Sequence, residues 1–290
     1  MVTRVFQVLC GVILFFVFTS AFSETVFYTK SGARFQQVSQ NAEGSINWVF
    51  LPGGPGLGSE YLRPFVDKLN LPGTTWLLDM PGDGSNTLGD RKVDYNYWPA
   101  NLASAVKTLP NVILVAHSFA GMLTLSSPGL QHHLLGLVLI DTAPNHQWMT
   151  SSKPFQSKAL LKAQKAYFAN PSDQTLKSLT FAMAPYFFLE KDMKKGKALL
   201  NNLPYNNKAF AWASQYFDPQ YEAKWAPEKI PVLIITGAQD HLTPVSLFEN
   251  DQQFHRKNIR IVVIPNAAHF SWIGHVKLFN QLFKRFFHTR

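Results

Sequence analysis

The feature that most constrains the fold is a series of short apolar runs separated by helical patterns. Residues 112–115, Val-Ile-Leu-Val, form one such run and include no polar side chain that would face solvent. Strands of this kind are buried on both faces, which happens when helices cover both sides of a parallel sheet. We therefore predict an α/β fold with an eight-stranded, mostly parallel sheet flanked by helices. The candidate strands are 25–30, 34–39, 46–51, 75–79, 112–117, 136–141, 232–236 and 261–264.

Two departures from this pattern refine the architecture. Ser31-Gly32 joins the first two candidate strands, which favours an antiparallel hairpin at the start of the sheet. Strand-like sequence stops between about residues 142 and 227, where helical patterns are broken by prolines, and it resumes at Pro231. We expect a core of residues 24–141 and 228–290, with residues 142–227 inserted as a helical cap over one edge of the sheet.

Residues 1–23 have the composition of a targeting segment. Arg4 precedes an almost wholly apolar stretch, and Ala21-Phe22-Ser23 offers small residues suited to cleavage. The pattern predicts a signal peptide and a secreted or periplasmic protein. The apolar stretch is shorter than the run of about 20 residues that a membrane-spanning helix needs. The alternative to a signal peptide is an uncleaved membrane anchor. The one cysteine, Cys10, lies in this segment, so the cleaved chain would form no disulfide.

The formal net charge of +9 would suit an anionic partner only if the basic residues clustered. They are scattered, and the densest group is interpreted as a solvated helix face: Lys191, Lys194, Lys195 and Lys197. No nucleic-acid motif, metal-ligand spacing or dinucleotide glycine pattern accompanies them. We expect no metal, no cofactor, no nucleic acid and no obligatory membrane partner, and the sequence does not indicate an oligomeric state.

A candidate nucleophile stands where the strand 112–117 runs directly into a helical pattern. A serine on such a sharp turn has a strained backbone and an exposed Oγ, and close packing requires small residues two places to either side. Ser118 meets this description, with Ala116 and Ala120 where the usual G-x-S-x-G pattern has glycine. On this position alone, a helix-capping serine is the alternative.

The partners of a nucleophilic serine follow the last two candidate strands. Such a serine needs a histidine as general base and an acid that orients it. Asp240 follows the strand 232–236, and His269 follows the strand 261–264. We predict that Ser118, His269 and Asp240 meet at the carboxyl edge of the sheet. Asp141, at the end of the strand 136–141, is the alternative acid.

A glycine-rich loop, Pro52-Gly53-Gly54-Pro55-Gly56, follows the strand 46–51. Backbone N–H groups on such a loop can stabilise the oxyanion of a tetrahedral intermediate, whereas a simple tight turn is the alternative.

These motifs together resemble the α/β-hydrolase superfamily. The order Ser118, Asp240, His269 is that of the superfamily, and residues 79–85, Asp-Met-Pro-Gly-Asp-Gly-Ser, are similar to its D-x-P-G-x-G-x-S segment. The resemblance covers residues 24–290 except the cap, and it implies Gly54 and Phe119 as the oxyanion N–H donors. The loop 52–56 is similar to the His-Gly-Gly-Pro-Gly loop of the prolyl iminopeptidase branch, with proline in place of histidine.

The resemblance implies a serine hydrolase that cleaves an ester or related small acyl compound through an acyl-enzyme. Ala-His-Ser-Phe-Ala around Ser118 is closer to esterases than the Gly-Gly-Ser-Trp-Gly of prolyl iminopeptidases. The alternatives are an iminopeptidase-like aminopeptidase, which needs a carboxylate such as Glu190 or Glu222 for the substrate amine, and a non-hydrolytic lyase or binding member. Aromatic residues of the cap suggest an apolar ceiling over the site, and the alternative for most of them is the core of the cap: Phe168, Phe181, Tyr186, Phe187, Phe188, Trp212, Tyr216 and Phe217.

Overall fold

The computed structural model describes residues 25–41, 45–87, 92–151 and 157–288. The segment assigned above to a signal peptide, residues 1–23, lies outside these ranges. Among the described residues, no helix has the length and apolar character needed to cross a membrane.

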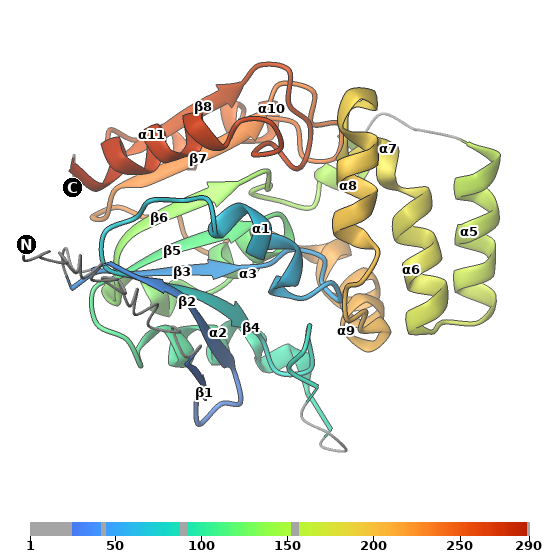
Figure 1. Ribbon diagram of the computed structural model, residues 1–290, viewed down its shortest axis with the longest axis horizontal. Coiled ribbons are helices and arrows are strands. Elements are labelled where there is room, and N and C mark those ends of the chain that lie inside the picture. Colours follow the sequence, from blue (N-terminus) through green and yellow to red (C-terminus); the bar gives the residue numbers. More distant parts are fainter. Residues whose placement is uncertain (1–24, 42–44, 88–91, 152–156, 289–290) are drawn as a thin grey trace, which may run out of the picture.

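Eight strands form one sheet, as predicted, and their bounds differ from the predicted ones by no more than two residues at either end. The spatial order is β1-β2-β4-β3-β5-β6-β7-β8 (Figure 1). Strands β1, β2 and β4 pair antiparallel, and the remaining pairs are parallel. The strands are β1 (Val26–Tyr28), β2 (Arg34–Gln40), β3 (Asn47–Leu51), β4 (Thr74–Asp79), β5 (Val112–His117), β6 (Leu134–Ile140), β7 (Val232–Gly237) and β8 (Ile259–Ile264).

Helices cover both faces of the sheet, which explains the continuous apolar strands. Alternate residues of β3 enter different clusters: Trp48 and Phe50 pack on one side, and Val49 and Leu51 on the other. The first side is covered by α1 (Arg63–Val66) and α11 (Val276–His288), and the second by α2 (Trp98–Val106) and α3 (Phe119–Leu125). A short helix, α10 (Ser246–Glu249), lies between β7 and β8. In the central strands β5 and β7, every residue is therefore buried whichever way its side chain points.

The described residues between β6 and β7 contain helices and one isolated bridge between Asn145 and Glu222. We call residues 142–227 the insertion. The α-helices and the π-helix of the insertion are α4 (Trp148–Ser151), α5 (Lys158–Ala169), α6 (Asp173–Ala182), α7 (Ala184–Phe187), α8 (Met193–Leu200), α9 (Asn207–Trp212) and a π-helix (Ala213–Phe217). Figure 1 shows α5, α6 and α8 beyond the ends of the strands.

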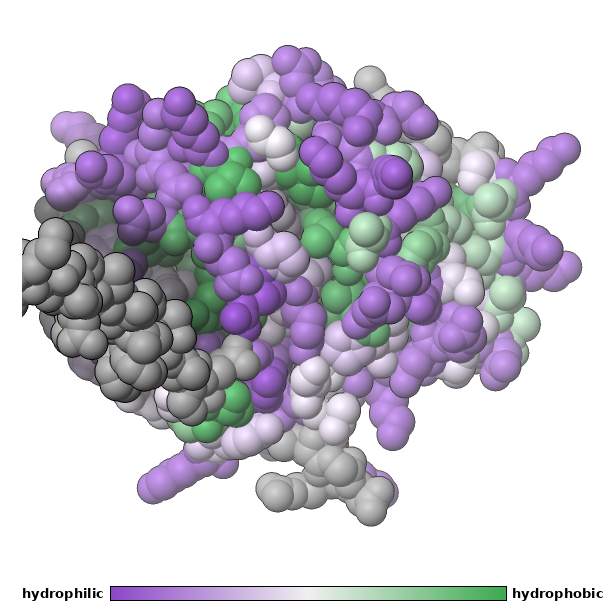
Figure 2. Space-filling view, viewed as in Figure 1, coloured by the Kyte–Doolittle hydropathy of each residue, from purple (hydrophilic) through white to green (hydrophobic). Residues whose placement is uncertain are grey.

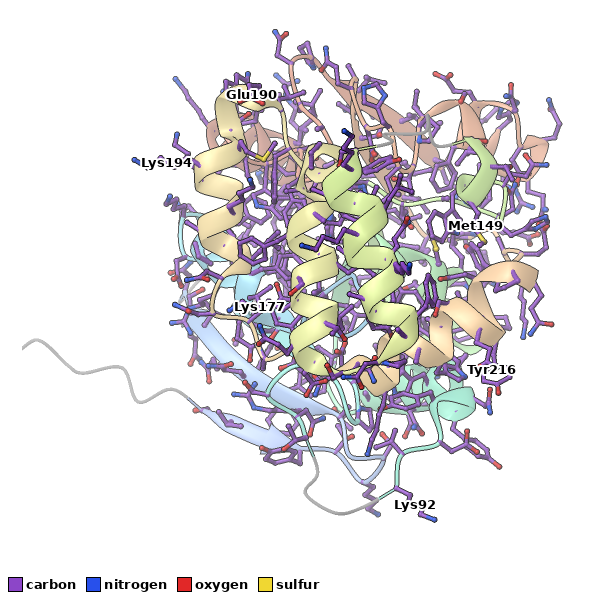
Figure 3. The ribbon with its side chains drawn as sticks, turned by 90° about the vertical axis from the view of Figure 1, so that its right-hand side faces the viewer. Lys92, Met149, Lys177, Glu190, Lys194 and Tyr216 are labelled. Atoms are coloured by element: carbon purple, nitrogen blue, oxygen red, sulfur yellow. The ribbon has the colours of Figure 1, made fainter. Side chains whose placement is uncertain are left out.

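The insertion shares an apolar core with the sheet, since Leu176 and Leu200 belong to the same apolar cluster as Phe50 in β3. The lysines 191, 194, 195 and 197 are all exposed, as predicted for a solvated helix face. Hydrophilic and apolar residues are interspersed on the face shown in Figure 2, and Lys194 points away from α8 in Figure 3.

Candidate active site

Ser118 occupies the turn between β5 and α3 with φ 54° and ψ −125°. A positive φ is rare for a residue with a side chain and is retained where the surrounding structure enforces it. The side chain makes no hydrogen bond that caps α3, so the capping interpretation is not supported. A Cβ at Gly121 would lie 2.5 Å from Thr142 Oγ1. The close approach therefore requires glycine at position 121, and Ala116 and Ala120 fit beside it, buried.

The structure joins the three polar residues that follow β5, β7 and β8. The Ser118 hydroxyl lies 2.8 Å from His269 Nε2, and His269 Nδ1 lies 2.9 Å from Asp240 Oδ2. All three side chains are buried. With a neutral imidazole, Nδ1–H donates to Asp240 and Nε2 accepts from Ser118, which is the arrangement a general base requires.

Asp240 is held in place as an ionised carboxylate. Its Oδ1 accepts hydrogen bonds from the N–H groups of Leu242 and Thr243, and its Oδ2 accepts one from Thr243 Oγ1 at 2.8 Å. Burial alone would raise its pKa, but the His269 charge and the donors from His269 and Thr243 outweigh it and hold the pKa below its ordinary value. A charged Asp240 can therefore orient His269 and stabilise an imidazolium.

Asp141, the alternative acid, lies nearby but bonds elsewhere. Its Oδ1 accepts from the Gly237 N–H, and its Oδ2 accepts from the N–H and hydroxyl of Ser271. Burial first, and then the neighbouring Asp240 charge, raise the pKa of Asp141 well above its ordinary value. Within the part of the chain that the structure describes, Asp240 and not Asp141 bonds the His269 ring.

The glycine-rich loop lies against Ser118. A Cβ at Gly53 would lie 2.6 Å from Ser118 Cβ, so only glycine permits this approach. Gly54, with φ 122°, and Phe119 both line the cavity in front of Ser118. The N–H of Phe119 belongs to the first turn of α3, where helical N–H groups have no partner within the helix. The backbone is thus suited to supply the two predicted oxyanion donors.

The structure contains a buried hydrogen-bond chain behind the site that the sequence did not predict. The Gly53 N–H donates to the Tyr61 hydroxyl at 2.5 Å, and that hydroxyl donates to His117 Nδ1 at 2.7 Å. His117 Nε2–H then donates to the backbone oxygen of His269 at 3.0 Å. Burial, and then the His269 charge, lower the pKa of His117 well below its ordinary value, so its ring is neutral. These hydrogen bonds link the glycine-rich loop to the loop that carries His269.

The apolar cavity in front of Ser118 has a volume of about 210 Å³. Of the eight aromatic residues predicted to form its ceiling, only Phe187 lines it; Phe168 and Tyr216 are mostly exposed instead. The other seven do not line the cavity, and some of them pack instead against the core, as Phe188 does against Phe270 and Phe217 against Phe119. Other apolar side chains of the insertion take their place: Trp148, Met149, Leu176, Met183 and Phe210.

Neither carboxylate considered for amine binding lines this cavity. Glu190 lies at the outer end of the insertion in Figure 3, and Glu222 pairs with His146 at 2.8 Å on the surface. The cavity instead contains Asp218, which the sequence analysis did not single out. Among the described residues, no group of three or more His, Cys, Asp or Glu side chains is placed to hold a metal ion.

The sheet and the site together define a hydrolase of the α/β fold. The model of the alpha/beta hydrolase family matches residues 48–281, most of the chain, and the protein belongs to this family. It is 24% identical over 257 residues to a pimeloyl-[acyl-carrier protein] methyl ester esterase of Wigglesworthia glossinidia brevipalpis, a match that covers 84% of this chain and 94% of the relative.

Solved structures share the fold at low sequence identity. A thermophilic esterase from Thermogutta terrifontis matches with a TM-score of 0.64 and 14% identity, over 92% of this chain and 98% of the other. A proline iminopeptidase of Mycobacterium smegmatis matches with a TM-score of 0.63 and 16% identity, over 92% and 98%. At these identities the likeness concerns the fold, which esterases and an iminopeptidase share.

Proposed function

We propose that this protein is a serine esterase that cleaves a small or medium acyl ester through an acyl-enzyme. The observation that carries the proposal is the continuous hydrogen-bond chain from Ser118 through His269 to Asp240, which faces a cavity lined mainly by apolar side chains. The related methyl ester esterase supports ester rather than amide chemistry.

In the proposed mechanism, Ser118 Oγ attacks the ester carbonyl while His269 Nε2 takes its proton. The N–H groups of Gly54 and Phe119 stabilise the oxyanion. His269 then protonates the leaving alcohol, and water, activated by the same imidazole, releases the acid from Ser118. Asp240 keeps His269 in the required tautomer throughout.

The test is a panel of 4-nitrophenyl esters of increasing acyl length alongside amino-acid 4-nitroanilides. We expect turnover of the esters and at least about 1,000-fold less with Ser118→Ala, because the nucleophile is lost. Ser178→Ala, which removes an exposed hydroxyl on α6, is the control and should retain wild-type rates. Comparable activity of the Ser118→Ala protein, or turnover of anilides alone, would overturn the proposal.

The same panel addresses the aminopeptidase alternative. The two carboxylates considered for the substrate amine, Glu190 and Glu222, lie outside the cavity, so an aminopeptidase would have to use Asp218, which lines it. A preference for proline or other amino-acid anilides over esters would support the aminopeptidase alternative.

We also propose that residues 142–227 act as a cap that selects the substrate, since they supply a large part of the lining of the cavity in front of Ser118. The predicted signal peptide, residues 1–23, leads to the proposal of a secreted or periplasmic enzyme, with a membrane anchor as the alternative. Mass spectrometry of the protein recovered from its producing cells distinguishes these outcomes, because cleavage after Ser23 removes the segment.

A further inference from the structure

The cavity wall contains two buried polar atoms that no described residue satisfies. These are the indole nitrogen Nε1 of Trp148, a donor, and Oδ1 of Asp218, an acceptor. Both residues line the cavity in front of Ser118. A buried polar atom without a partner costs free energy, and binding sites are where such atoms are retained.

The other polar side chains of this wall already have partners. Ser214 Oγ donates to the Ala211 carbonyl, Thr180 Oγ1 to the Leu176 carbonyl, and Thr243 Oγ1 to Asp240. Trp148 and Asp218 therefore stand apart from their neighbours as groups whose hydrogen-bonding capacity is left for a ligand.

The two residues come from segments that lie side by side. Trp148 begins α4, and Asp218 directly follows the π-helix of the insertion, an irregularity that often marks functional sites. The His146 N–H donates to the Tyr221 carbonyl at 2.7 Å, which fastens one segment to the other. Their sequence neighbours Met149 and Tyr216 lie on the same flank of the molecule in Figure 3. Trp148 and Phe217 also pack against one apolar cluster.

The chemistry of the pair narrows the ligand. An ammonium group has donors only and leaves the Trp148 N–H unpaired, whereas a carboxylate has acceptors only and is repelled by Asp218 in its ionised form. A hydroxyl group both accepts and donates, so one hydroxyl that reaches both atoms would satisfy both. Burial also raises the pKa of Asp218 to about 7, which reflects the lack of any compensating donor.

We propose that Trp148 and Asp218 form a polar subsite that binds a hydroxyl group on the acyl chain of the substrate. The proposal rests on the proposed function, since it assumes that the acyl chain enters this cavity from Ser118. It specifies the substrate class as hydroxyacyl esters.

The test compares matched esters in which a terminal CH₂OH replaces CH₂CH₃: 4-nitrophenyl 6-hydroxyhexanoate against the heptanoate, and 8-hydroxyoctanoate against the nonanoate. We expect kcat/KM to favour the hydroxy ester by about tenfold at one length or both, because two buried groups gain partners. Asp218→Ala and Trp148→Phe should bring this ratio close to one. Asp218→Asn, which retains an acceptor oxygen, should keep more of the preference than Asp218→Ala.

A ratio of two substrates on one preparation cancels differences in the amount of folded enzyme. Tyr216 is exposed and lies on the π-helix that precedes Asp218. Tyr216→Phe is therefore the control and should keep the wild-type ratio. A wild-type ratio near one at both lengths, or a preference for 4-nitrophenyl 6-aminohexanoate over the hydroxy ester, would overturn the subsite.

A second measurement separates the subsite from the proposed chemistry. The Ser118→Ala protein is titrated calorimetrically with methyl 6-hydroxyhexanoate and methyl heptanoate, which needs no turnover. About tenfold tighter binding of the hydroxy ester supports the subsite even if Ser118 proves not to be the nucleophile. Equal affinities contradict the subsite even if the esterase activity is established.

Discussion

The loops after β6 and β7 bring two buried aspartates to the same end of the sheet, yet the two carboxylates have opposite electrostatics. Asp240 bonds the His269 ring, and its pKa is held below the ordinary value. Asp141 bonds Gly237 and Ser271, and its pKa is raised. Asp240 and Asp141 therefore share their position at the sheet edge and their burial. They differ in the groups that bond their carboxylate oxygens, and these groups decide the role of each acid.

Under the proposed function, Asp240 takes part in the chemistry and Asp141 supports the architecture. Asp141 ties the end of β7 to the residue two places after His269, so it supports the base without touching its ring. The predictions below test this division of labour.

The largest effect is expected from Asp240→Asn. The N–H groups of Leu242 and Thr243 would hold the amide oxygen, so the amide NH₂ would take the place of Oδ2 and face His269 Nδ1 as a donor. The ring then adopts the wrong tautomer, and kcat should fall by about 1,000- to 10,000-fold. Steady-state kinetics with a 4-nitrophenyl ester measures this. Asp67→Asn, at an exposed aspartate, is the control. A fall of less than tenfold would show that Asp240 does not orient the base.

Asp141→Asn should lower stability rather than activity. Its amide NH₂ would face the N–H of Ser271, which now meets a donor instead of an acceptor, so we expect the free energy of unfolding to fall by about 1–3 kcal/mol. Activity per folded molecule should stay within about threefold of wild type, because the His269 ring is not contacted. Urea denaturation and kinetics on one preparation measure both quantities. A loss of activity as large as that of Asp240→Asn would make Asp141 part of the chemistry.

Tyr61→Phe tests the buried hydrogen-bond chain that joins the glycine-rich loop to the loop carrying His269. The change leaves the Gly53 N–H and His117 Nδ1 without their buried partner, which loosens both the oxyanion loop and the His269 backbone. We expect kcat to fall about tenfold with little change in KM, since the defect concerns positioning for the reaction. The control is Tyr97→Phe at an exposed position. A change confined to KM would contradict a positioning role.

The smallest expected effect concerns pH. Because the folded pKa of Asp141 is raised, its contribution to stability is complete below its unfolded pKa of about 4 and is lost as pH rises through the folded value. The contribution of Asp240, whose pKa is lowered, has the opposite sign and is lost as pH falls. Asparagine at position 141 does not titrate.

The stability difference between wild type and Asp141→Asn should therefore be larger at pH 4 than at pH 8. Other buried acids with raised pKa values, such as Asp79 and Asp83, are common to both proteins and cancel in the comparison. Urea denaturation at several pH values gives the difference. Parallel curves would show that Asp141 titrates normally in the folded state.

The sheet could be predicted from sequence because its signal is local. Apolar runs buried on both faces mark each strand, and the residue that follows a strand must lie at the sheet edge. The same rule brings Ser118, Asp240 and His269 together. It does not separate Asp141 from Asp240, since both follow strands. The groups that distinguish them are distant in the chain: Gly237 and Ser271 for Asp141, and the His269 ring for Asp240.

The insertion was less predictable. Two of its helices, α4 and α7, are four residues long, too short for a periodicity that tells which side chains point inward. Choosing aromatic and acidic residues by type therefore led to Phe168 and Glu190, whereas the structure places Trp148 and Asp218 in the cavity wall. Tyr61 gave no signal either, because its partners Gly53 and His117 become neighbours only after folding.

The most direct test of the central claim, that Ser118 is a nucleophile activated by His269, is intact-protein mass spectrometry after reaction with a fluorophosphonate. We expect one adduct per chain, located on Ser118 by peptide mapping, absent in Ser118→Ala and formed far more slowly in His269→Ala. An unlabelled wild-type protein that still cleaves esters, or an adduct on a different residue, would contradict the account.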